Sequence, residues 1–210
     1  STDYCTVTGL TYAQFAGGTS RIVAICGTRG SYLSSGAWVD LNIDPFTSGQ
    51  NNQFVFTPAL STLVATNDTD KPYQWTGSAS TVWMPVGFTG LTNAIQQARI
   101  TTFFQNYLLF GNTVEAGTRY PTRVRWSNVG FINTWTDADY NDVAAPAGQD
   151  LNCIGQLFGD VYLGFTNSLY RGEKGPRAVE QAKLGTTLGF EFYTVPYLRA
   201  AAAGQHDNAL

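Results

Sequence analysis

Charged residues are scarce in this chain of 210 residues, since Asp, Glu, Lys and Arg make up only 13% of it, about half the share in ordinary soluble domains. The net charge is −3, and no basic stripe exists that could follow a phosphate backbone, which argues against specific nucleic-acid binding. No apolar run approaches the roughly 20 residues of a membrane-spanning helix. We therefore expect no membrane partner.

Residues for acid–base or nucleophilic catalysis are equally few. The single histidine, His206, lies close to the end of the chain, where a Ser-His-Asp or Cys-His site would have to use it. Of the four glutamates, Glu115, Glu173 and Glu180 have loop-like surroundings that predict solvated charges, and Glu191 lies between two phenylalanines on an outer strand. No carboxylate pair of the glycosidase type stands out. We expect a protein that is not an enzyme and that uses no cofactor.

The cysteines are three, Cys5, Cys26 and Cys153, and their spacing matches no zinc motif. Cys26 and Cys153 lie in apolar strand patterns, where a free thiol behaves as a small hydrophobic group. We expect buried thiols and no disulfide.

Other candidate sites have weak signals. Asp137, Asp139 and Asn141 alternate as in a calcium loop, but the sixth position of the motif is Asp142 and no glutamate follows, so a solvated turn is the favoured interpretation. Asn67-Asp-Thr69 matches the N-glycosylation pattern on a predicted turn.

Three tryptophans are candidates for stacking on sugars: Trp75, Trp83 and Trp135. They occupy matching positions in successive repeats, which favours packing between neighbouring units over ligand binding.

Aromatic residues (14%) and glycines (22 residues) are abundant, as expected for many short strands joined by tight turns. Four segments repeat one pattern: a strand-like stretch, an apolar strand, a Gly/Asn turn, and two shorter strands with aromatics. The apolar strands are at 21–26, 63–66, 107–110 and 161–165. A sheet that is apolar on both faces must be covered on both, and radial stacking of four-stranded blades does this.

The pattern predicts an all-β fold, a β-propeller of four-stranded antiparallel blades. We place the blades at about 5–44, 52–87, 97–137 and 151–196, and 197–210 as the start of a further blade, so that the chain is expected to be a fragment. One β-sandwich, or two in succession, is the competing architecture. Single helical turns are expected at 92–99 and 178–184.

The stretch 171–188 is predicted to be an exposed loop that contacts a partner. Its candidate contact residues are Arg171, Glu173, Lys174, Arg177, Glu180 and Lys183.

Three strings in the second, third and fourth units carry a family resemblance. The string of the second unit is Leu-Val-Ala-Thr-Asn-Asp at 63–68 with Lys-Pro-Tyr-Gln-Trp-Thr-Gly at 71–77. The string of the third unit is Tyr-Pro-Thr-Arg-Val-Arg-Trp-Ser-Asn-Val-Gly at 120–130 with Asn-Thr-Trp at 133–135. The string of the fourth unit is the stretch 154–170. In the same order they resemble segments of β-propeller proteins from the tails and necks of tailed bacteriophages. Asn128 and Phe131 depart from the family pattern, which often has Asp there.

The resemblance implies a virion structural protein of the nozzle or hub type, located in the phage tail or neck and in the host cytoplasm during assembly. It implies portal, adaptor or tail subunits as partners, self-association in a ring, and packaged DNA only as passing cargo. The alternative from another class is a carbohydrate-binding propeller that uses the three tryptophans.

Overall fold

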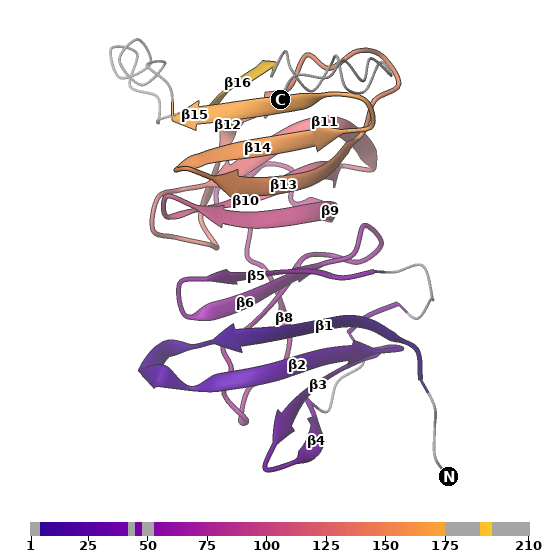
Figure 1. Ribbon diagram of the computed structural model, residues 1–210, viewed down its shortest axis with the longest axis vertical. Helices are drawn as coiled ribbons and strands as arrows, with labels where there is room; N and C mark the ends of the chain where they lie inside the picture. The colour runs from indigo at the N-terminus through magenta and orange to yellow at the C-terminus, as the bar shows by residue number, and fades with distance from the viewer. Residues whose placement is uncertain (1–4, 42–44, 48–52, 175–189, 195–210) are drawn as a thin grey trace, which may run out of the picture.

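The computed structural model describes residues 5–41, 45–47, 53–174 and 190–194 (Figure 1). In these residues the fold is all-β, with sixteen strands and one 3₁₀ turn, Ala16–Gly18. The strands form four separate antiparallel sheets of four strands, and each sheet keeps the order of the sequence. The predicted all-β class and the four repeated units are confirmed, and no sheet in the described part closes on itself.

Sheet 1 consists of β1 (Val7–Gln14), β2 (Ser20–Cys26), β3 (Arg29–Ser34) and β4 (Ala37–Asp40). Sheet 2 consists of β5 (Val55–Ala59), β6 (Thr62–Thr66), β7 (Tyr73–Trp75) and β8 (Met84–Pro85). Sheet 3 consists of β9 (Ile95–Phe104), β10 (Tyr107–Glu115), β11 (Thr118–Ser127) and β12 (Trp135–Asp142). Sheet 4 consists of β13 (Leu151–Leu157), β14 (Asp160–Phe165), β15 (Leu169–Lys174) and β16 (Phe190–Thr194).

Tight turns explain why consecutive strands pair. Between β10 and β11, Ala116 and Gly117 have φ values of 48° and 77°, and between β3 and β4, Ser35 and Gly36 have values of 50° and 82°. Two central residues with positive φ match the right-handed twist of the strands that they join. The chain therefore folds into simple up-and-down sheets.

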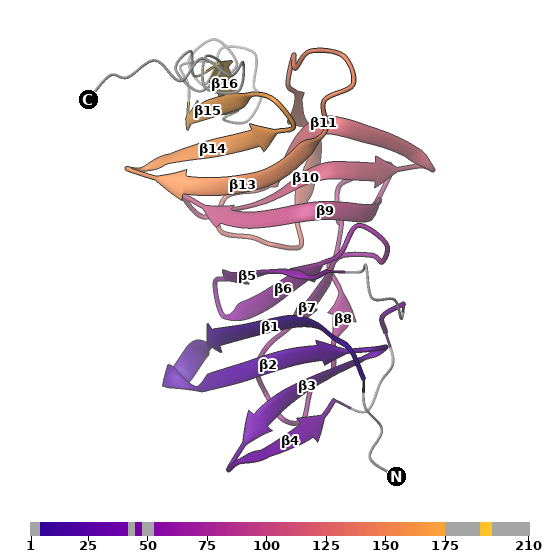
Figure 2. The same cartoon turned by 45° about the vertical axis from the view of Figure 1, so that its right-hand side comes forward.

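The four sheets are stacked face to face in sequence order (Figures 1 and 2). Three apolar cores lie between them. The core between sheets 1 and 2 contains Val23, Ile25, Trp75 and Trp83. The core between sheets 2 and 3 contains Val64, Phe110 and Trp135. The core between sheets 3 and 4 contains Leu109, Trp126, Val161 and Leu163. Both faces of sheets 2 and 3 are thus covered, which explains their unbroken apolar strands.

The first strands of successive sheets lie side by side, since β5 contacts β1 and β9, and β9 contacts β13. The helical turn predicted at 92–99 is wrong, because β9 begins at Ile95 and pairs along β10. The other predicted turn, 178–184, lies outside the described residues. Among the residues that are described, no helix is long and apolar enough to cross a membrane.

Candidate functional site

Sheet 1 has one apolar face that no other sheet in the described part of the chain covers. Its inner strands point Val23 and Ile25 into the core with sheet 2, so the alternate side chains point the other way. We call this the open face of sheet 1, and its members are Leu10, Tyr12, Ile22, Ala24, Cys26 and Trp38. Leu10 is 63% exposed, Tyr12 62% and Trp38 51%. Exposed apolar residues gathered on one face make this face a candidate interaction site.

A hollow of about 840 Å³ lies on the open face, lined by Leu10 and Trp38 and by the polar residues Arg29, Ser31 and Asp40. The Ser31 hydroxyl donates to Asp40 over 2.5 Å, and Arg29 lies 3.7 Å from the same carboxylate. The polar groups are paired with one another at the rim. The face therefore presents an apolar floor without an uncompensated charge.

A disulfide joins Cys5 to Cys26 beside this hollow, with 5.6 Å between the Cα atoms. The prediction of buried thiols is wrong here, because β1 pairs antiparallel with β2 and brings Val7 opposite Cys26. It is wrong for Cys153 too, whose thiol is free but exposed on β13. Strand register, which composition does not reveal, decides both cases.

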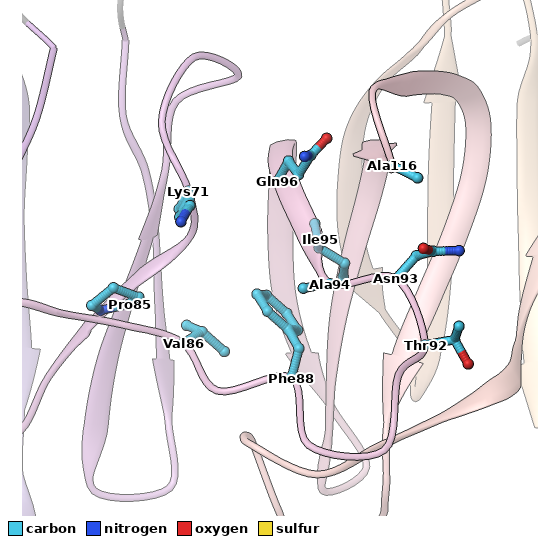
Figure 3. A pocket seen from close by; sticks show the side chains of 10 residues that line it. All are labelled: Lys71, Pro85, Val86, Phe88, Thr92, Asn93, Ala94, Ile95, Gln96 and Ala116. Atoms are coloured by element: carbon cyan, nitrogen blue, oxygen red, sulfur yellow. The ribbon is translucent and has the colours of Figure 1, made fainter.

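A second hollow of about 520 Å³ lies between sheets 2 and 3 (Figure 3). Lys71 faces it from the segment after β6, Phe88 and Asn93 from the connection between β8 and β9, and Gln96 from β9. These residues offer one ammonium group, two amides and a phenyl ring. They are suited to a small polar ligand, and no motif in the sequence pointed to them.

A buried ionic cluster occupies the outer half of sheet 3. The Glu115 carboxylate accepts hydrogen bonds from Nε of Arg125 (3.0 Å), from Nη2 of Arg125 (2.7 Å) and from Nη1 of Arg123 (3.2 Å). The guanidinium of Arg123 lies 3.6 Å from the ring centroid of Tyr120 and 4.0 Å from that of Tyr140. The prediction that Glu115 is a solvated loop charge is wrong, because it ends β10 opposite β11.

The charges of this cluster compensate each other. Burial by itself lowers the pKa of Arg123, but the hydrogen bond to Asp142 and the charges of Glu115 and Asp142 outweigh it and raise that pKa. Every ionised group here has a partner of opposite charge. The cluster is thus suited to fixing the β10–β11–β12 register, and it offers no free acid or base.

The candidate metal residues lie on strand β12, and the turn predicted for them is wrong. Asp137 accepts hydrogen bonds from the amide (2.8 Å) and hydroxyl (2.6 Å) of Thr92, whereas Asp139 is 3% exposed. Alternate residues of a strand are about 6.6 Å apart, so Asp137 and Asn141 are too far from each other to share one ion. Within the described ranges, no three His, Cys, Asp or Glu residues are grouped to hold a metal.

Burial raises the pKa of Asp139 to about 6, although the hydrogen bond from Thr136 and the charge of Arg125 act in the opposite direction. Burial also raises the pKa of Tyr107, with a contribution from the charge of Asp139. Asp139 is therefore a buried carboxyl that titrates within the physiological range. The sequence predicted Asp139 as a weak metal candidate in a solvated turn, so its burial on a strand was not expected.

The remaining candidates are structural. Trp75, Trp83 and Trp135 are buried between sheets, so the predicted packing role is confirmed. Asn67 is buried as well, and its side-chain oxygen accepts hydrogen bonds from the amides of Thr69 (3.1 Å) and Asp70 (2.8 Å). Its side chain closes a turn and is not accessible for glycosylation.

Three of the six predicted partner-contact residues lie on a strand and not in a loop. Arg171, Glu173 and Lys174 belong to strand β15, and Arg171 donates to Asp160 over 2.7 Å. The other three candidates, Arg177, Glu180 and Lys183, lie outside the described residues.

Comparison with known proteins adds the fold and no family. No family model matches the chain, and no curated protein matches it. A chain in a crystal structure of an active polycomb repressive complex 2 in the basal state is similar in structure, with a TM-score of 0.53 and 6% sequence identity. The match covers 82% of this chain and 38% of that chain. At this identity the likeness concerns the arrangement of the sheets alone.

Proposed function

We propose that the chain is part of a β-propeller that serves as a virion structural protein of a tailed bacteriophage. In this role it forms part of the tail or neck channel and docks to portal or adaptor proteins and to itself in a ring. The observation that carries the proposal is the open face of sheet 1, an apolar surface that no other sheet of the described residues covers. The phage assignment comes from the sequence resemblance.

Three features support the propeller. Each sheet is a four-stranded meander, the sheets are stacked through apolar faces, and their first strands lie side by side. In a propeller the blades have this topology, and the first strands surround a central channel. The low net charge of −3 suits a conduit that DNA passes without being held.

The three tryptophans on which the carbohydrate-binding alternative depends are not available to stack on a sugar. Trp75, Trp83 and Trp135 are all buried between sheets and present no ring face to a ligand. The packed ionic cluster of sheet 3 likewise has no acid–base pair open to solvent. A structural role therefore accounts for more of the described residues.

Assembly in solution tests the proposal. Electron microscopy and analytical ultracentrifugation of the chain should show annular oligomers or tail-shaped assemblies. The Tyr12→Lys substitution places a charge on the open face and should reduce assembly. Phe131→Lys is the matched control, because Phe131 is also 62% exposed but lies in the β11–β12 connection. A strictly monomeric wild-type chain at all concentrations would refute the proposal.

A further inference from the structure

Lys71 gives the hollow between sheets 2 and 3 a positive charge (Figure 3). Among the described residues that line the hollow, Lys71 is the only charged one. It belongs to none of the ion pairs of the described part of the chain. The adjacent carboxylate of Asp70 instead accepts hydrogen bonds from the amide (2.9 Å) and hydroxyl (2.6 Å) of Thr47 and from the side chain of Asn67 (2.8 Å). The ammonium group is therefore available to an anion from solution.

Two side-chain amides add hydrogen-bond donors to the lining. The side-chain oxygen of Gln96 accepts a hydrogen bond from the backbone amide of Gly117 over 2.7 Å, which fixes the orientation of that side chain. The NH₂ group of Gln96 donates to no described residue, and the side chain of Asn93 has no hydrogen-bond partner among them either. An anion in the hollow therefore meets amide donors as well as the ammonium group.

Apolar side chains form much of the remaining lining. Val86 and Ile95 are buried, and Phe88 packs against the cluster that contains them. The ring of Phe88 lies 6.1 Å from that of Phe110 and 5.5 Å from that of Trp135, measured between centroids, so its position is fixed by the core. The apolar part of a ligand that contacts these side chains is removed from water, which favours binding.

The connection between β8 and β9, which supplies Val86, Phe88 and Asn93, is held at both ends. The amide of Val86 donates to the carbonyl oxygen of Pro72 over 2.9 Å. Near the other end, Thr92 donates to Asp137 from its amide (2.8 Å) and from its hydroxyl (2.6 Å). Because this wall of the hollow is already ordered, a ligand loses little affinity to the ordering of the chain.

We propose that this hollow binds a small organic carboxylate, whose charged group meets the side chains of Lys71 and Gln96 and whose apolar part lies against Val86, Phe88 and Ile95. Its volume of about 520 Å³ falls within the range of about 300–1,000 Å³ of small-molecule sites. A ligand bound there contacts sheets 2 and 3 together. The site goes beyond the proposed structural function, and assembly of the chain does not depend on it.

Three probes test the class of ligand. Phenylacetate carries a carboxylate and a phenyl ring, phenylacetamide is its uncharged analogue, and acetate lacks the ring. In NMR titrations of the chain, phenylacetate should bind with a dissociation constant on the order of 1 mM, as expected for a ligand of this size. Each of the other two should bind about tenfold more weakly or less. Equal affinity for phenylacetamide or for acetate, or no saturable binding of phenylacetate, would overturn the proposal.

Variants of the chain test the location of the site. Lys71→Met should weaken the binding of phenylacetate about tenfold, because a hydrogen bond to a charged group is lost, whereas Lys71→Arg should retain it. Arg171→Met is the matched control, since it removes the same charge from sheet 4. Ala94 is an exposed lining residue, so Ala94→Phe should fill the hollow and abolish binding without a change in the circular dichroism spectrum. Binding that survives both Lys71→Met and Ala94→Phe would place the ligand elsewhere and refute the proposal.

Discussion

Arg125 and Glu115 form a two-pronged ion pair across strands β10 and β11, with Nε to Oε1 at 3.0 Å and Nη2 to Oε2 at 2.7 Å. Both side chains are only 5% exposed. Arg125 also donates from Nη1 to the carbonyl oxygen of Asp137 over 3.2 Å. One guanidinium therefore joins three strands of sheet 3.

Removal of one member of this ion pair should lower the stability of the folded chain. Glu115→Gln leaves two guanidinium groups buried with less compensation, and we expect the free energy of unfolding to fall by about 3–5 kcal/mol. Denaturant titration measures the change. Asp160→Asn is the control, because its pair with Arg171 is partly exposed and should contribute below about 1 kcal/mol. Equal losses in the two variants would contradict the assigned role.

Trp135 should be among the most sensitive positions of the core. Its ring stacks on Phe110 with 5.4 Å between centroids, and its indole nitrogen donates to the Gly87 carbonyl over 3.0 Å. Trp135→Ala should lower the free energy of unfolding by about 3–5 kcal/mol. Trp38→Ala, on the open face, should change it by less than about 0.5 kcal/mol. The opposite ranking in thermal or chemical unfolding would show that sheets 2 and 3 are not packed as described.

Asp139 should make stability fall as pH rises. Its pKa is raised to about 6 by burial, so between its ordinary pKa and pH 6 the folded chain binds more protons than the unfolded chain. The stability associated with this group is complete at low pH and is lost as pH rises through 6. Asp139→Asn should therefore be more stable than the wild type at pH 7.5, by on the order of 2 kcal/mol, and the two should converge near pH 4.

Asp137, on the same strand, provides a control because its pKa is shifted in the opposite direction to that of Asp139. Hydrogen bonds from the side chain and the backbone of Thr92 lower the pKa of Asp137, so its stabilisation is present above its ordinary pKa and is lost as pH falls. Asp137→Asn should be less stable than the wild type at neutral pH, with the deficit shrinking toward pH 3. Parallel pH profiles for the two variants would disprove the distinction between the carboxyls.

The cysteines allow a chemical test of the register of sheet 1. Alkylation of the denatured, unreduced chain should label Cys153 alone, and reduction should expose two more thiols, those of Cys5 and Cys26. The disulfide spans 21 residues, so its loss in Cys5→Ser with Cys26→Ser should cost about 3 kcal/mol. Three free thiols in the native, unreduced chain would show that the two ends of the β1–β2 hairpin are apart.

The sheets could be predicted because the residue pattern that indicates each strand lies within a short stretch of the sequence. The run Leu63 to Ala65, or Leu108 to Phe110, is apolar on both faces and is bounded by turn residues, which suffices to predict a covered strand. The inference failed where polar residues belong to strands. Asp139 is one such residue. Whether its carboxyl is buried or solvated depends on its neighbours in space, which the sequence does not show.

The functional candidates depended on pairing between strands. Glu115 is followed by an Arg-Val-Arg alternation at 123–125 that places two guanidinium groups on one face of β11, and this signal could have suggested their partner. The bond between Cys5 and Cys26 and the position of Leu10 needed the register of β1 on β2. Register is set by turn geometry and by packing, and a single sequence specifies it only loosely.

The order of strands within each sheet has a consequence for biosynthesis. Because strands that pair are also neighbours along the chain, each meander can form soon after it leaves the ribosome. The apolar face of a newly formed sheet that packs against the following sheet is covered once that following sheet has been translated and has folded.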